Sequence, residues 1–95
     1  MNVIDTFEIP EELGRELTEL LAKQVINDRI LSSVADQPEK YQTVMNAQIG
    51  IQRNIDRIKW VITEEYVPDE YRSDRHSWNY NGYDIAANKV DIIKN

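Results

Sequence analysis

The sequence predicts a mainly α protein in which two long helices form an antiparallel hairpin and a short C-terminal β-hairpin follows them. Three observations predict this fold class. Apolar residues recur every three or four positions along residues 10–35 and again along residues 38–66. Pro10 and Pro38 each stand where a helix can begin. The pair Asn81–Gly82 is suited to a tight turn between two strands.

The 95 residues are predicted to form one small domain, because their length and apolar content are ordinary for a single core. The absence of cysteine excludes a disulfide framework, a thiolate zinc site and a cysteine nucleophile. No stretch approaches the roughly 20 apolar residues of a membrane span. We therefore expect a cytoplasmic protein, or part of a particle assembled inside the cell, with no membrane partner.

The charge of the chain is negative and unevenly distributed. A formal net charge of −6 disfavours direct binding to nucleic acid, whose phosphates attract basic surfaces. Residues 1–38 hold eight acidic and three basic groups. Arg53, Arg57 and Lys59 form a basic cluster, which we expect to pair with acidic residues of the first helix. A contact with phosphate or RNA is the alternative role for this cluster.

The first helix is predicted over residues 10–35. Its main apolar stripe consists of Leu13, Leu17, Leu20, Leu21, Val25, Leu31 and Val34. Ile26 and Ile30 lie almost opposite this stripe when positions advance by about 100° per residue. A helix with two apolar faces is covered on two sides, either by its own chain or by another copy.

The second helix is predicted over residues 38–66. Four isoleucines spaced by four, three and four residues form a coiled-coil-like seam along it: Ile51, Ile55, Ile58 and Ile62. Trp60 lies off this seam. Gly50 interrupts the helix at a propensity cost of about 1 kcal/mol relative to Ala, which either a close helix crossing or plain tolerance explains.

The aromatic tail, residues 67–95, contains the predicted β-hairpin around Asn81–Gly82. The cross-strand pairs in this register are Tyr80 with Tyr83 and Trp78 with Ile85. An isolated two-stranded hairpin is marginal in water. We therefore expect its aromatic face to cover the two helices or to bind a partner.

The two ends of the chain are predicted less specifically. Residues 1–9 form a short apolar arm ahead of the first helix. In the segment 86–94, Ala86, Val90 and Ile93 recur at helical spacing, which predicts a short terminal helix after the β-hairpin.

The sequence indicates no catalytic or metal chemistry. His76 is the single histidine, and Asp74 and Ser77 lie near it in the sequence. These are the residue types of a nucleophilic triad, but nothing else in the sequence indicates one. Residues adjacent in a polar connector rarely meet in the geometry that such a triad requires. One histidine, no cysteine and no calcium-loop pattern also argue against a metal site. We therefore expect neither an enzyme nor a bound cofactor.

The leading functional hypothesis is a non-catalytic protein–protein interaction or assembly module that self-associates through its helical faces, with the aromatic tail as a docking surface. Aromatic residues dominate the energetics of many interfaces. The predicted interaction residues are Ile26, Ile30, Ile51, Ile55, Ile58, Trp60, Ile62, Trp78, Tyr80 and Tyr83.

The alternative hypothesis is a small acidic regulator or inhibitor, of the kind that phages and other mobile elements encode, which blocks a basic site on a target protein. Its acidic surface consists of Glu11, Glu12, Glu16 and Glu19 on the first helix. The helix dipole explains the same residues without a target, because carboxylates stabilise a helix N-terminus.

Overall fold

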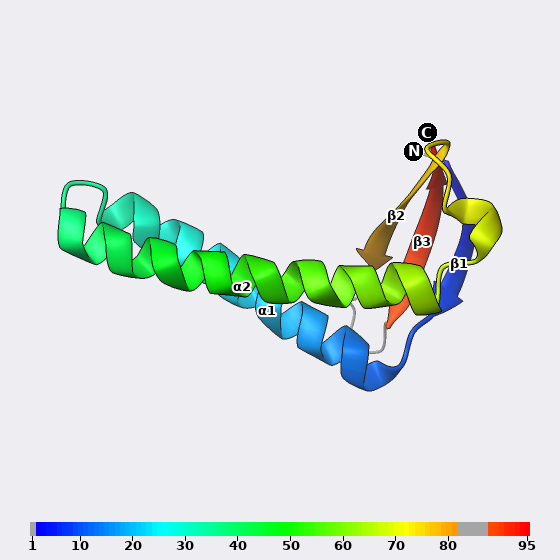
Figure 1. Ribbon diagram of the computed structural model, residues 1–95, viewed down its shortest axis with the longest axis horizontal. Coiled ribbons are helices and arrows are strands. Elements are labelled where there is room, and N and C mark those ends of the chain that lie inside the picture. The colour runs from blue at the N-terminus through cyan, green and yellow to red at the C-terminus, as the bar shows by residue number, and fades with distance from the viewer. Residues whose placement is uncertain (1, 82–87) are drawn as a thin grey trace.

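The computed structural model describes residues 2–81 and 88–95, and it shows a mainly helical protein with a small antiparallel sheet (Figure 1). The elements in chain order are β1 (Val3–Glu8), α1 (Glu11–Ser33), α2 (Pro38–Glu65), the 3-10 helix η1 (Asp69–Tyr71), β2 (His76–Asn81) and β3 (Lys89–Lys94).

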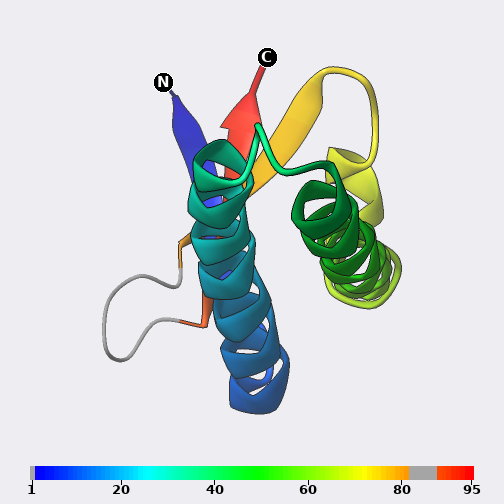
Figure 2. The same cartoon turned by 90° about the vertical axis from the view of Figure 1, so that its left-hand side faces the viewer.

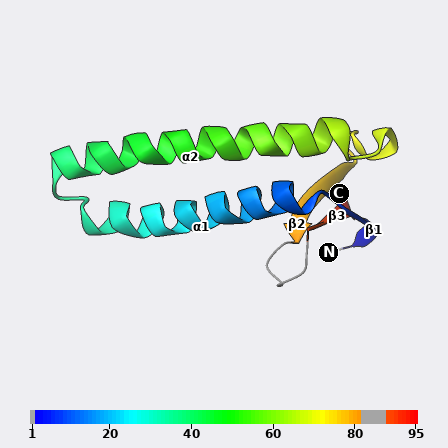
Figure 3. The same ribbon diagram turned by 90° about the horizontal axis from the view of Figure 1, so that it is seen from below.

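The two long helices run side by side in opposite directions and are joined by a short turn (Figures 1 and 3). The Val34 N–H donates to the Ile30 carbonyl at 3.0 Å, and the Gln37 N–H donates to the Val34 carbonyl at 2.9 Å. Pro38 is the first residue of α2, where a missing N–H is not needed. Both helices start within one residue of the predicted position.

The sheet has the order β1–β3–β2, and both pairings are antiparallel. β2 pairs with β3, so that Trp78 lies opposite Ile92 and Tyr80 lies opposite Val90. The sequence predicts other partners for these two residues, namely Ile85 for Trp78 and Tyr83 for Tyr80. Residues 82–87, which include Gly82, Tyr83 and Ile85, lie outside the described residues.

The predicted terminal helix over 86–94 is wrong in its described part, because residues 89–94 form the central strand β3. Val90 and Ile92 point to the same side of this strand and are both fully buried. A six-residue segment of three apolar and three charged residues has no decisive periodicity of its own. Its position between two other strands determines its conformation here.

The predicted N-terminal arm contains a strand that the sequence reading missed. β1 pairs with β3 from Val3 to Glu8, with an irregular register between Val3 and Asp5. Beyond the strand, the Ile9 N–H donates to the Asn88 carbonyl at 2.8 Å, which ties the entrance of α1 to the start of β3.

The hydrophobic core lies where one face of the sheet packs on the helix ends next to it. Its buried members are Ile9, Leu17, Leu20, Ile55, Ile58, Ile62, Val67, Val90 and Ile92. No residue from 21 to 54 is buried. We call residues 22–54, which project beyond the sheet, the distal arm (Figures 1 and 3). Figure 2 views the two helices from the end of this arm.

Candidate interaction surfaces

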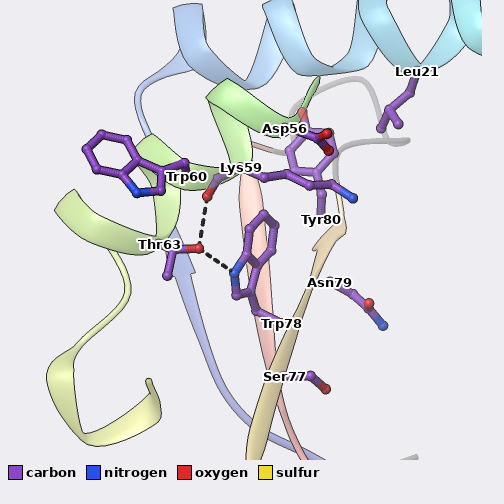
Figure 4. A pocket seen from close by; sticks show the side chains of 9 residues that line it. All are labelled: Leu21, Asp56, Lys59, Trp60, Thr63, Ser77, Trp78, Asn79 and Tyr80. Atoms are coloured by element: carbon purple, nitrogen blue, oxygen red, sulfur yellow. Dashed lines mark hydrogen bonds between the residues drawn. The ribbon is translucent and has the colours of Figure 1, made fainter. Parts of the chain in front are cut away.

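An open groove lies between α2 and the edge strand β2 (Figure 4). It has a volume of about 840 Å³. Its lining residues in the described part of the chain come from three elements: Leu21 of α1, Asp56, Lys59, Trp60 and Thr63 of α2, and Ser77, Trp78, Asn79 and Tyr80 of β2. Three of the predicted interaction residues, Trp60, Trp78 and Tyr80, are thus brought together at one site.

Trp78 forms a fixed aromatic wall of the groove. Its indole Nε1–H donates to Thr63 Oγ1 at 3.0 Å, and that hydroxyl donates in turn to the Lys59 carbonyl at 2.9 Å (Figure 4). The half-buried indole N–H is therefore satisfied within the protein. Trp78 presents ring surface to the groove, and its polar group is already engaged.

Tyr80 binds the sheet to α1. Its hydroxyl donates to the Gly14 carbonyl at 2.7 Å and lies 2.8 Å from Thr18 Oγ1. A Cβ on Gly14 would stand 3.0 Å from the tyrosine hydroxyl and 3.2 Å from the Asn88 Cβ. Glycine at position 14 therefore permits the close approach between helix and sheet.

The groove is also lined by an exposed tryptophan and by two charged side chains, Asp56 and Lys59. Trp60 is 64% exposed, although tryptophan is a largely buried residue type on average. Asp56 accepts a hydrogen bond from Gln52 Nε2 at 2.9 Å. Among the described residues, Lys59 forms no ion pair within 4.0 Å.

The distal arm combines a polar helix interface with an apolar exterior. Between its helices, Gln48 Nε2 donates to Asp28 Oδ1 at 2.8 Å, and Gln24 donates to Gln52. Its exposed large hydrophobic residues are Val25, Ile26, Ile30, Tyr41 and Ile49, with exposed fractions between 37% and 56%. These five apolar side chains are thus directed outward, and no residue of the arm is fully buried.

The structure divides the predicted interaction residues into groups of different accessibility. Ile26, Ile30 and Trp60 are exposed, and Ile51, Trp78 and Tyr80 are half-buried. Ile55, Ile58 and Ile62 belong to the core of the chain. Tyr83 lies outside the described residues.

The sequence reading missed Lys59 and Thr63 as members of the groove. The signal available was their spacing, because residues four apart on a helix are neighbours on its surface. That spacing places both near Trp60 on one flank of α2, but it does not disclose that β2 lies against this flank.

Two groups that the sequence suggested as functional, the basic cluster and the segment around His76, have local partners. Glu16 and Arg57 form an exposed ion pair at 3.6 Å, which is the kind of pairing expected between the basic cluster and the first helix. Ser77 Oγ donates to Asn95 Oδ1 at 3.0 Å, whereas His76 Nδ1 lies 3.2 Å from Ser73 Oγ. The sequence-adjacent triad is therefore not assembled.

Tyr71 lies beside this histidine at the end of the sheet. Its ring meets that of His76 edge to face, with centroids 5.2 Å apart. Desolvation, followed by the carboxylates of Asp5 and Glu70, raises the pKa of Tyr71. Its hydroxyl donates to Asp5 Oδ2 at 3.2 Å, so the cluster fastens η1 to β1.

In the described part of the chain, no three side chains of His, Asp or Glu gather in a way that could hold a metal ion. Within that same part, neither helix has the length and apolar character needed to cross a membrane. No family model, no curated protein and no solved structure matches the chain.

Proposed function

We propose that this protein is a non-catalytic interaction and assembly module that self-associates through its distal arm. One observation carries the proposal. The arm exposes five large hydrophobic side chains and contains no buried residue, so its apolar surface has no cover within the described chain.

The charge distribution favours a second copy as the partner. Residues 22–54 hold three acidic and four basic groups, whereas the rest of the chain holds fourteen acidic and seven basic groups. Two arms therefore approach each other with little repulsion, while two sheet ends repel. Antiparallel, coiled-coil-like packing of the arms about a two-fold axis keeps the acidic ends apart.

The outer face of α1 is the contact surface in this arrangement. Ile26 and Ile30 are one helical turn apart on the side away from the buried stripe. Burying each isoleucine contributes about 1.5–3 kcal/mol, and the association itself costs about 4–15 kcal/mol. These magnitudes overlap, so self-association is expected to be weak and to depend on concentration.

Light scattering coupled to size-exclusion chromatography tests this proposal over a wide concentration range. Ile26→Lys combined with Ile30→Lys is expected to leave a folded monomer, as judged by circular dichroism. The matched control adds the same charge on α2 of the arm, with Gln42→Lys and Asn46→Lys, and is expected to self-associate normally. A wild-type monomer at every concentration, or equal loss in both variants, would contradict the proposal.

An acidic regulator that blocks a basic site is the second candidate, favoured by the strong negative charge outside the arm. Glu11 and Glu12 are exposed in the first turn of α1. If this role holds, salt-sensitive binding to polylysine should disappear when Glu11, Glu12, Glu16 and Glu19 are all changed to Gln. Self-association through the arm should persist in the same variant. Unchanged polylysine binding would rule out this surface.

A further inference from the structure

A second depression lies at the far end of the distal arm, beside the turn that joins α1 to α2 (Figures 1 and 3). It has a volume of about 380 Å³. Its lining residues in the described part of the chain are Ile30 and Val34 at the end of α1, and Glu39, Lys40, Thr43 and Val44 at the start of α2. We call this depression the tip pocket.

The tip pocket fits an uncharged apolar side chain. Ile30, Val34 and Val44 give it an aliphatic surface. The two charged residues of its described lining, Glu39 and Lys40, carry opposite charges, so the lining selects neither an anion nor a cation by its net charge. Ile30 is 39% exposed, which leaves part of the aliphatic surface in contact with solvent.

Ile30 also connects the tip pocket to the outer face of α1. Ile26 lies one turn before it on this face. In a two-fold contact the same patch serves both copies, so that a residue pairs with a second residue and that residue pairs back with the first. Pairing Ile26 with Ile30 of an antiparallel partner gives two isoleucine pairs, whereas pairing either residue with its own counterpart gives only one. We call the first arrangement the crossed register.

The crossed register brings Ile26 of each copy to the tip pocket of the other, because Ile30 borders that pocket. The side chain then lies in a hole to which both helices of the partner contribute, as a knob does in coiled-coil packing. Three residues further along each helix, Lys23 lies opposite Ser33 of the partner copy. Both are exposed, Ser33 is small, and the Lys23 ammonium can extend into solvent, so this layer permits close approach.

We propose that two arms associate in the crossed register, with Ile26 of each copy inserted into the tip pocket of the other. The inference rests on the proposed self-association and adds to it the register and the acceptor site. Each copy supplies one isoleucine and one pocket, and the two-fold contact uses both. Assembly through this face therefore ends at a dimer.

Introduced cysteines report the register directly, because the chain has none of its own. Copies with Lys23→Cys, mixed with copies that carry Ser33→Cys, are expected to form a disulfide-linked heterodimer on oxidation. Each variant alone is the matched control. In the crossed register its two cysteines are ten residues apart along the paired helices, about 15 Å, whereas a disulfide spans Cα atoms within about 7 Å.

Filling the tip pocket tests its role as the acceptor. Thr43→Phe adds a ring in the space that Ile26 of the partner copy would take, and is expected to raise the dissociation constant of the dimer at least about tenfold. The control, Gln42→Phe, adds the same ring at an exposed position outside the described lining, and should leave this constant within about twofold. Circular dichroism checks that both variants are folded.

The outcomes separate this inference from the proposed function. Self-association without the mixed crosslink, crosslinking of either variant with itself, or equal effects of Thr43→Phe and Gln42→Phe would overturn the crossed register and leave self-association standing. A wild-type chain that stays monomeric at every concentration would overturn both. Binding of an apolar dye to that monomer, with changes in the methyl resonances of Val34 and Val44, would then assign the pocket to a small ligand.

Discussion

The two halves of the helix pair differ in what lies between the helices. Next to the sheet, Leu17, Ile55 and Ile62 fill the space and are almost completely buried. In the distal arm, the Gln48–Asp28 hydrogen bond lies between the helices, and Val25, Ile26 and Ile49 are exposed. A continuous apolar repeat in the sequence therefore does not make a continuous core. The sheet supplies the third surface that burial requires.

The largest contrast is expected from truncating one isoleucine in each half. Ile62→Ala removes a fully buried side chain and should lower the free energy of unfolding by about 2–5 kcal/mol. Ile26→Ala removes a 56% exposed side chain and should change monomer stability by less than about 0.5 kcal/mol. Denaturant titration of the dilute monomer measures both. Comparable losses would mean that the arm contributes to the core as much as the sheet end does.

The two helical glycines should respond to alanine with opposite signs. Gly50→Ala meets no atom within 4 Å and should stabilise the protein by about 1 kcal/mol through helix propensity. Gly14→Ala would displace the Tyr80 hydroxyl or Asn88, so a net loss of about 1 kcal/mol is expected despite the same gain in propensity. Thermal unfolding of both variants checks the signs. Stabilisation by both would show that the sheet can move away from α1.

The smallest contrast concerns two threonines on α2, each of whose hydroxyls donates to the carbonyl four residues earlier. Thr63 Oγ1 also accepts the Trp78 indole N–H, so Thr63→Val should cost about 1 kcal/mol. Thr43 is exposed in the arm, and Thr43→Val should have an effect within about 0.5 kcal/mol. Denaturant titration and the tryptophan emission spectrum together distinguish the loss of this hydrogen bond from a general loss of stability.

The helices could be predicted from sequence because their determinants are local. Pro10 and Pro38 mark both starts, and the spacing of leucines and isoleucines marks both courses. The sheet could not be predicted in the same way. Trp78 pairs with Ile92, and no local pattern in the sequence indicates this partner. The pair Asn81–Gly82 instead locally favours a tight turn and therefore a different register.

The candidate groove was predictable in its residue types and not in its boundaries. Trp60, Trp78 and Tyr80 are aromatic residues in polar surroundings, which made them candidates for an interface. Their convergence depends on how β2 crosses α2, and this follows from packing between segments distant in sequence. The same packing removes Ile55 and Ile58 from the surface, although their spacing alone indicates a face open to a partner.

The two ends of the described chain lie next to each other, because β1 and β3 are paired strands and the Lys94 N–H donates to the Asn2 carbonyl at 3.3 Å (Figure 1). This proximity makes the protein suitable for circular permutation. A short linker could join the ends, and the chain could be reopened in the turn between Ser33 and Pro38. The permuted protein would keep the sheet and its groove, while its two helices would no longer be joined at their outer ends.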